Sequence, residues 1–201
     1  MSPEEIAVRM TRRSALSGLR GDHDLSGLPR PSPPLKPAAV LVGIVVRAEG
    51  PGIILTQRTA HLADHAGQIS FPGGRIEPED KDPEAAALRE AQEEIGLDPR
   101  RVRLLGRLDC YETGTGYSVT PVVALVRPPF ELRPDPYEVD DIFEVPLHFV
   151  LDRRNHERRS REWQGKTRHF YVLPYQNRYI WGATAGMLVN LVDVLAAEGL
   201  T

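Results

Sequence analysis

Three glutamates, Glu90, Glu93 and Glu94, stand close together in the segment "ALREAQEEIGL", residues 87–97. On a helix, residues three and four positions apart share a face, so these carboxylates would crowd one flank near the C-terminal end. Like charges at these spacings repel, and negative side chains are also unfavourable at that end of the helix dipole. We expect no Lys or Arg one turn away to offset this charge, so the pattern predicts a bound cation.

Length, composition and charge predict one soluble globular domain. The chain has 201 residues, of which 41% are hydrophobic and 26% charged, which is enough for a single core. A net charge of -3 lacks the basic field that nucleic-acid binders show, so we expect no nucleic-acid partner. The single Cys110 cannot form an internal disulfide, which favours a cytoplasmic location. The longest apolar run, residues 38–46, falls short of the roughly 20 residues that span a bilayer, so no membrane segment is expected.

The remaining elements predict an α/β fold in which helices cover both faces of a mixed sheet. We expect residues 1–36 to form a helical and Pro-rich N-terminal extension and residues 37–201 to form the main domain. Asp82 is the expected N-cap of the glutamate helix, Pro83 its first residue and Gly96 its stop. A terminal helix over 183–197 presents an aliphatic face to the core or to a second subunit in a homodimer. The expected strands are 38–46 and 52–58, which form a hairpin, then 102–109, 119–126, 140–147, and finally 168–175 and 178–182 around a Pro turn.

The charged run "DRRNHERRSRE", residues 152–162, is interpreted as a solvated loop. Its arginines would also suit a phosphate or RNA patch, but three interspersed acids dilute the positive charge. The loop is therefore the preferred interpretation.

The segment "GGRIEPEDKDPEAAALREAQEEIGL", residues 73–97, resembles the Nudix box. That pattern is Gly, five residues, Glu, seven residues, Arg-Glu, two residues, Glu-Glu, one residue, Gly and an aliphatic residue. The second half is in register from Arg89 to Leu97. In the first half Asp80 replaces the usual Glu, and eight residues rather than seven separate it from Arg89. The coenzyme A pyrophosphatase branch of the family shows this longer spacing with Asp.

An upstream segment, "ILTQRTAHLADHAGQISFPGG", residues 54–74, resembles the signature of the same branch. Arg58, Gly67 and the run 71–74 match it. Thr59 replaces a Ser or Ala, and Ala63 stands where the branch has a second Arg. An Arg can make bidentate charge-assisted bonds to phosphate that Ala cannot, so Ala63 leaves the substrate open. The segment "TGYSVTPVV", 115–123, also resembles the branch.

The resemblance implies a Nudix α/β/α sandwich with a mixed β-sheet between helices, and an enzyme that hydrolyses a diphosphate bond with Mg²⁺ or Mn²⁺. The expected substrate is coenzyme A or an acyl-CoA, and the products are a phosphopantetheine species and adenosine 3',5'-bisphosphate. The alternatives are ADP-ribose, a dinucleoside polyphosphate or another nucleotide as substrate, and a non-catalytic nucleotide- or RNA-binding module on the same fold.

The resemblance also assigns roles to individual residues, and the acids suit a hard cation that prefers oxygen ligands. Glu93, Glu94 and Arg89 are the expected catalytic residues, with Arg89 orienting a carboxylate, either Asp80 or Glu77. The base that takes a proton from the attacking water is Glu93, Glu94, Glu138 or Glu144. The expected metal ligands are Glu90 and Glu94 first, then Glu93 and the Gly74 carbonyl, and the expected substrate-binding residues are Arg58, Phe71 and Gly73.

Overall fold

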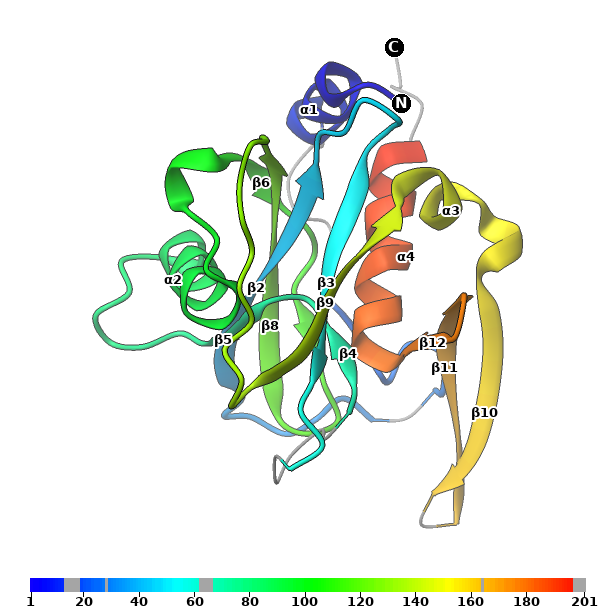
Figure 1. Cartoon of the computed structure of the whole chain (residues 1–201). Coiled ribbons are helices and arrows are strands. Elements are labelled where there is room, and N and C mark those ends of the chain that lie inside the picture. Colours follow the sequence, from blue (N-terminus) through cyan, green and yellow to red (C-terminus); the bar gives the residue numbers. More distant parts are fainter. Residues whose placement is uncertain (13–18, 28, 62–66, 164, 197–201) are drawn as a thin grey trace.

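The structure, a computed structural model, describes residues 1–12, 19–27, 29–61, 67–163 and 165–196. Within these ranges the chain forms four α-helices and two β-sheets, one of nine strands and one of three (Figure 1). The helices are α1 (Pro3–Arg12), α2 (Pro83–Ile95), α3 (Leu147–Leu151) and α4 (Gly182–Ala196), with short 3-10 turns at Pro99–Arg101 and Arg153–Asn155. The strands are β1 (Arg20–Gly21), β2 (Lys36–Val45), β3 (Gly52–Arg58), β4 (Ile69–Ser70), β5 (Gly73–Arg75), β6 (Val102–Arg107), β7 (Tyr111–Glu112), β8 (Tyr117–Val126), β9 (Val139–Pro146), β10 (Glu157–Trp163), β11 (Lys166–Tyr175) and β12 (Arg178–Trp181).

The larger sheet is mixed, as its strand pattern predicts. Its centre is the parallel pair β2–β8, which stays in register from Lys36 opposite Tyr117 to Val45 opposite Val126. These strands are apolar over most of their length because both faces are covered. β3 returns antiparallel to β2, with Ile44 opposite Ile53, which confirms the predicted hairpin. The strand order is β1-β7-β8-β2-β3-β4, with β5 beside β2, β6 beside β8 and β9 beside β3.

Two helices cover the opposite faces of this sheet (Figure 1). Side chains alternate along β3: Ile54 packs with the alanines of α2, whereas Leu55 packs with the leucines of α4. The predicted arrangement of a mixed sheet between helices is therefore confirmed. Leu188, Leu191 and Leu195 of α4 are fully buried within the chain, so of the two roles predicted for this helix the structure shows the core.

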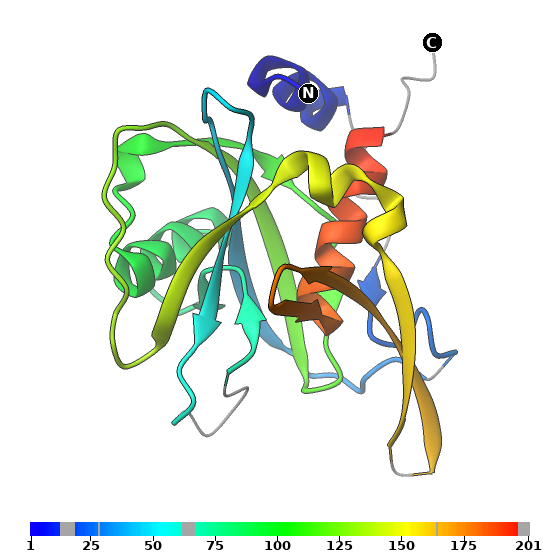
Figure 2. The same cartoon turned by 45° about the vertical axis from the view of Figure 1, so that its right-hand side comes forward.

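The smaller sheet, β10-β11-β12, corrects two predictions. Residues 157–162 of the charged run belong to β10 and not to a loop, and β10 forms a long hairpin with β11 that projects from the body (Figure 2). The predicted Pro turn is also wrong, because Pro174 lies within β11 opposite Tyr179. The chain reverses at Gln176 and Asn177 instead, and Gln176 has φ 53°, the left-handed conformation that two-residue hairpin turns favour.

The N-terminal segment packs on the main domain. Ile6 and Met10 of α1 are buried, and the helix lies against α4 and β6. β1 extends the sheet by pairing parallel to β7. The division of the chain at residue 36 stays a prediction. In the described residues, no helix is both long and apolar enough to cross a membrane.

Candidate active site

Local capping signals fix the position of α2. The Asp82 side chain accepts a hydrogen bond from the Ala85 N–H at 2.8 Å, and Pro83 occupies the first turn. Gly96 ends the helix in the left-handed conformation, with φ 67°. These observations confirm the predicted start and stop, because each depends on residues adjacent in sequence. The helix phase that they set decides where the glutamates point.

Two consecutive glycines bring the backbone of β5 onto these glutamates. The Gly73 N–H donates a hydrogen bond to Glu94 Oε2 at 3.1 Å. A Cβ atom at Gly74 would stand 2.6 Å from the Cδ atom of Glu90, closer than real contacts allow. Gly73 has φ 152°, a backbone conformation that a residue with a side chain would adopt only with strain. Glycine is therefore required at 74 for the Glu90 carboxylate to lie against the strand.

The two inner carboxylates are unusually protected from water. Glu94 is 4% exposed, and this burial raises its pKa to about 8. Burial likewise raises the pKa of Glu90, opposed by the neighbouring Arg89 guanidinium. The charge of Glu138 acts on both carboxylates in the same upward direction, although its side chain is exposed. Negative charges thus gather at the end of α2, which is a setting that favours a cation.

Arg89 links the two halves of the acidic segment. Its guanidinium donates to both Asp80 oxygens, at 3.1 and 2.9 Å, and also to Glu90 at 2.9 Å and Glu93 at 3.0 Å. Of the two carboxylates predicted to be oriented by Arg89, Asp80 is therefore the one that it holds. Glu77 instead donates its backbone N–H to the Asp80 side chain. The expectation that no cation stands one turn from the glutamates is wrong, because Arg89 lies four residues before Glu93 and pairs with it.

Arg58 and Phe71, both predicted to bind substrate, have different environments. Arg58 ends β3 with one terminal nitrogen 3.8 Å from Glu94 Oε1. Its Nε atom is buried and has no hydrogen-bond partner within the described part of the chain, so it is a donor suited to an anionic ligand. Phe71, in contrast, is 1% exposed and packs in the core, so its side chain anchors the loop and does not face a substrate.

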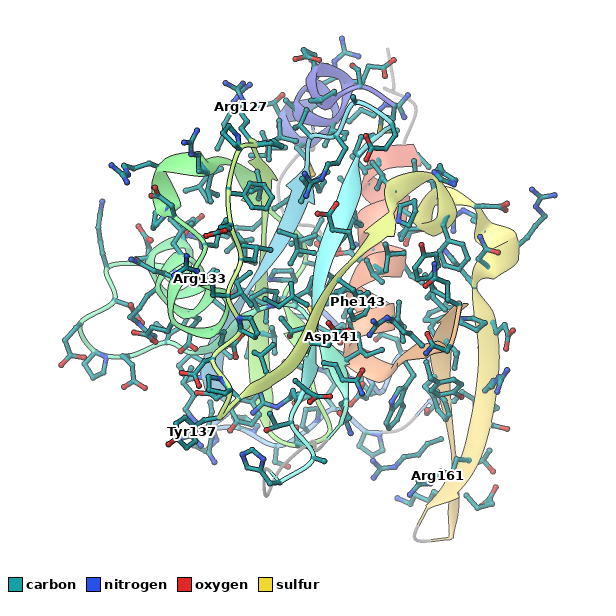
Figure 3. The ribbon with its side chains drawn as sticks, in the orientation of Figure 1. Arg127, Arg133, Tyr137, Asp141, Phe143 and Arg161 are labelled. Carbon is teal, nitrogen blue, oxygen red and sulfur yellow. The ribbon has the colours of Figure 1, made fainter. Side chains whose placement is uncertain are left out.

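The two acids proposed as bases outside the box lie at opposite ends of β9. Glu138 directly precedes the strand, next to Tyr137, and its carbonyl accepts a hydrogen bond from the Thr59 N–H beside Arg58. Figure 3 shows Tyr137 where the chain enters β9. Glu144 pairs with Arg47 at 2.6 Å, six residues further along the strand and roughly 20 Å away. Only Glu138 lies near Glu90 and Glu94.

The donors at the end of α2 fit a hard divalent cation in kind. They are carboxylates and backbone carbonyls, the ligands that Mg²⁺ and Mn²⁺ prefer. The described residues contain no group of three His, Cys, Asp or Glu side chains already gathered as a metal site. Glu93 is more than half exposed and turned to Arg89, so it would have to leave this ion pair to become a third ligand beside Glu90 and Glu94.

A groove of about 800 Å³ opens at the C-terminal end of β3, on the face of the sheet that α4 covers. Gln57 and Asp141, which pair directly across β3 and β9, line it together with Arg178 from β12. Arg178 binds Asp141 and lies over the Phe143 ring, and Figure 3 shows both partners on β9. Because Gln57 and Arg58 are adjacent, this groove and the carboxylates flank the same strand end. Ala63 lies outside the described residues.

Comparisons with known proteins identify the family of the chain. The NUDIX domain family model matches residues 36–164. The uncharacterized Nudix hydrolase NudL of Escherichia coli is 40% identical over 154 residues, which cover 77% of this chain and 80% of that protein, and the Shigella boydii protein of the same name matches equally.

Solved structures are more distant. A C. elegans Ap4A hydrolase is 22% identical with a TM-score of 0.48, over 55% of this chain and 80% of that one. A NUDIX hydrolase from Alicyclobacillus acidocaldarius is 18% identical with a TM-score of 0.48, over 83% and 98%. The family model and the 40% identity to NudL decide the assignment. The chain belongs to the Nudix hydrolase family.

Proposed function

We propose that this Nudix hydrolase cleaves the pyrophosphate bond of coenzyme A or an acyl-CoA, with Mg²⁺ or Mn²⁺, giving a phosphopantetheine species and adenosine 3',5'-bisphosphate. The observation that carries the proposal is the contact of Arg89 with Asp80 and Glu90. It supports a functional role for the long box spacing, because Asp80 is tied to the glutamates despite the extra residue. That spacing is the feature shared with the coenzyme A pyrophosphatase branch.

Glu90 and Glu94 would hold the cation, with the Gly74 carbonyl and, once it leaves Arg89, Glu93. A bound divalent cation lowers the pKa of coordinated water and neutralises charge on phosphoryl oxygens. The residues of the chain supply the positioning. The Gly73 N–H fixes one oxygen of Glu94, and Arg89 holds Asp80 against the start of the helix.

Arg58 is the residue proposed to bind the substrate pyrophosphate. Its unpartnered Nε donor lies beside Glu94, where an anion would meet the carboxylate-bound cation on one side and the guanidinium on the other. Guanidinium groups bind phosphoryl oxygens with paired, charge-assisted hydrogen bonds. Arg58 would therefore orient the phosphorus for attack by water.

A carboxylate must accept the proton that the attacking water loses as its oxygen bonds to phosphorus. Glu138 suits this role because it is solvent-exposed and lies within electrostatic reach of Glu90 and Glu94. Glu93 and Glu94 remain alternatives within the box. The ion pair of Glu144 with Arg47 makes it the weakest of the four candidates.

Ala63 favours a second candidate function, the hydrolysis of another nucleotide such as ADP-ribose or a dinucleoside polyphosphate. The chain lacks at that position the Arg of the branch signature. A non-catalytic nucleotide- or RNA-binding module is less well supported, because Glu90, Glu93 and Glu94 are all present and two of them meet the β5 glycines.

The decisive experiment is a substrate panel with product identification. The purified chain is incubated with coenzyme A, ADP-ribose and diadenosine polyphosphates, with Mn²⁺ or with a chelator. The Glu94→Gln protein, purified in parallel, controls for contaminating phosphatases. Metal-dependent formation of adenosine 3',5'-bisphosphate is expected from coenzyme A. Preferred turnover of ADP-ribose or a dinucleoside polyphosphate would support the second candidate, and no turnover of any compound would support the binding module.

A further inference from the structure

A cationic cluster lies on the sheet beside the active-site glycines. Arg75 of β5 donates two hydrogen bonds to the hydroxyl oxygen of Tyr117, from Nε at 3.3 Å and from Nη2 at 3.1 Å. The Nζ atom of Lys36 lies 5.6 Å from the centroid of the same ring. Lys36 and Arg75 are exposed, and Tyr117 is half-buried. Two positive charges and a phenol therefore share one accessible place.

Strand register explains why these three side chains meet. Lys36 of β2 is directly opposite Tyr117 of β8, and Ala38 of β2 is directly opposite Arg75. Residues opposite each other share a face of the sheet, as do residues two apart on a strand. The side chains of Lys36, Tyr117 and Arg75 therefore leave the sheet together. Their face is the one opposite Glu90, because Gly74 is the β5 residue on the Glu90 side.

The cluster is one residue away from the active site. Arg75 follows Gly74, and its carbonyl accepts a hydrogen bond from Arg89 at 3.1 Å. In the described part of the chain β5 pairs only with β2, so its outer edge is not covered by another strand. A ligand whose diphosphate lies at Glu90 and Glu94 can therefore extend around this edge to the side chain of Arg75.

We propose that Lys36, Arg75 and Tyr117 bind the ribose 3'-phosphate of coenzyme A, an inference that rests on the proposed function. In that substrate one sugar separates the 3'-phosphate from the pyrophosphate, so the two anions require two binding places close together. A phosphate monoester is an acceptor with up to two charges near neutral pH. It suits a guanidinium, an ammonium and a hydroxyl group, all of which donate hydrogen bonds. The cluster would thus select for substrates that carry this phosphate.

The test compares two substrates that differ only by that phosphate, coenzyme A and 3'-dephospho-coenzyme A. The ratio of their kcat/KM values is measured with Mn²⁺ for the wild-type chain and for Arg75→Gln, Lys36→Gln and Tyr117→Phe. Arg100→Gln is the matched control, since Arg100 is a highly exposed Arg that pairs with Asp98 beyond the end of α2. Binding of adenosine 3',5'-bisphosphate and of adenosine 5'-monophosphate is measured on the same proteins by calorimetry.

The wild-type chain is expected to prefer coenzyme A, and Arg75→Gln and Lys36→Gln are expected to lower the ratio about five- to tenfold each, the worth of one ordinary hydrogen bond, because both side chains are exposed to water. Arg100→Gln should keep the wild-type ratio. Equal kcat/KM values of the wild-type chain for the two substrates would overturn the inference. A ratio that is unchanged in both Arg75→Gln and Lys36→Gln would also overturn it. If coenzyme A is not hydrolysed at all, the proposed function fails separately. The calorimetry then tests the cluster alone. If the wild-type chain binds adenosine 3',5'-bisphosphate more tightly than adenosine 5'-monophosphate, and Arg75→Gln loses this difference, the cluster is an anion site. Equal binding of the two nucleotides refutes it.

Discussion

Gly74→Ala would place a methyl group where the carboxylate of Glu90 now lies. The added Cβ would stand 2.6 Å from both Cδ and Oε1 of Glu90 and 2.7 Å from Oε2. Non-bonded carbon atoms prefer separations of about 3.5–4.0 Å, so the carboxylate must retreat by about 1 Å. The carboxylate ends a flexible side chain, and an off-rotamer shift costs about 1 kcal/mol. The substitution should therefore displace a metal ligand while the chain stays folded.

A displacement of this size is large for catalysis. Metal–ligand distances are held to about 0.2 Å, and a misplacement of about 1 Å in a catalytic group costs about a hundredfold in rate. We expect kcat for Mn²⁺-dependent hydrolysis of coenzyme A to fall about a hundredfold in Gly74→Ala. Steady-state kinetics measure the loss, Mn²⁺ titration measures the weakened binding of the cation, and thermal unfolding checks the fold.

The matched control is Gly43→Ala, the same change on β2. A Cβ at Gly43 would have its nearest contact at 3.4 Å, to a methyl group of Val126, which is ordinary packing. Neither glycine has a positive φ, so backbone strain is absent from both variants. Gly43→Ala should keep wild-type kcat and Mn²⁺ affinity. Full activity of a folded Gly74→Ala protein would refute the idea that the Glu90 carboxylate must lie against β5.

Three further outcomes are expected. Glu94→Gln should reduce turnover at least about a hundredfold with an unchanged circular dichroism spectrum, since it removes one charge from the proposed metal site; unchanged turnover would remove Glu94 from that site. Ala63→Arg should raise turnover of coenzyme A relative to ADP-ribose, and an unaltered ratio would mean that position 63 does not contact the substrate. The Arg30 guanidinium holds the pKa of Glu112 below its usual value, so this pair stabilises the fold at neutral pH and loses its effect as the carboxyl is protonated. The drop in melting temperature caused by Arg30→Gln should therefore shrink between neutral pH and about pH 3, whereas a constant drop would argue against the ion pair.

The helix that carries the box was predictable because its signals are local. Asp82, Pro83 and Gly96 each act on backbone groups within a turn of themselves, so sequence alone gives the start and stop. The covering of both sheet faces was also predictable, since β2 and β8 are apolar on consecutive residues rather than on alternate ones.

β10 could not be predicted in the same way. Most of its residues are exposed on both faces, so Arg158 to Glu162 show no alternation of apolar and polar side chains. The strand forms because its partner β11 is anchored in the core through Val172 and Leu173. Such pairing is a tertiary effect, invisible in the charged segment itself.

The partners of the site residues depended only partly on spacing. The pair of Arg89 with Glu93 follows from their i,i+4 spacing on the helix, whereas its contact with Asp80, nine residues before it, depends on the reach of a guanidinium with donors on several sides. The packing of Gly74 on Glu90 requires β5 to lie against α2, which no local pattern indicates. The identities of the acids were therefore available from the sequence, but not the contacts that organise them.

The central claim is that Glu90 and Glu94 bind a divalent cation that the hydrolysis requires. A crystal of the chain soaked in Mn²⁺ tests it most directly through anomalous scattering. We predict an anomalous peak from a Mn²⁺ ion that is bound by carboxylate oxygens of Glu90 and Glu94 beside the Gly74 carbonyl. Glu93 is then released from Arg89. A fully soaked crystal with both side chains ordered and no anomalous peak between them would contradict the account.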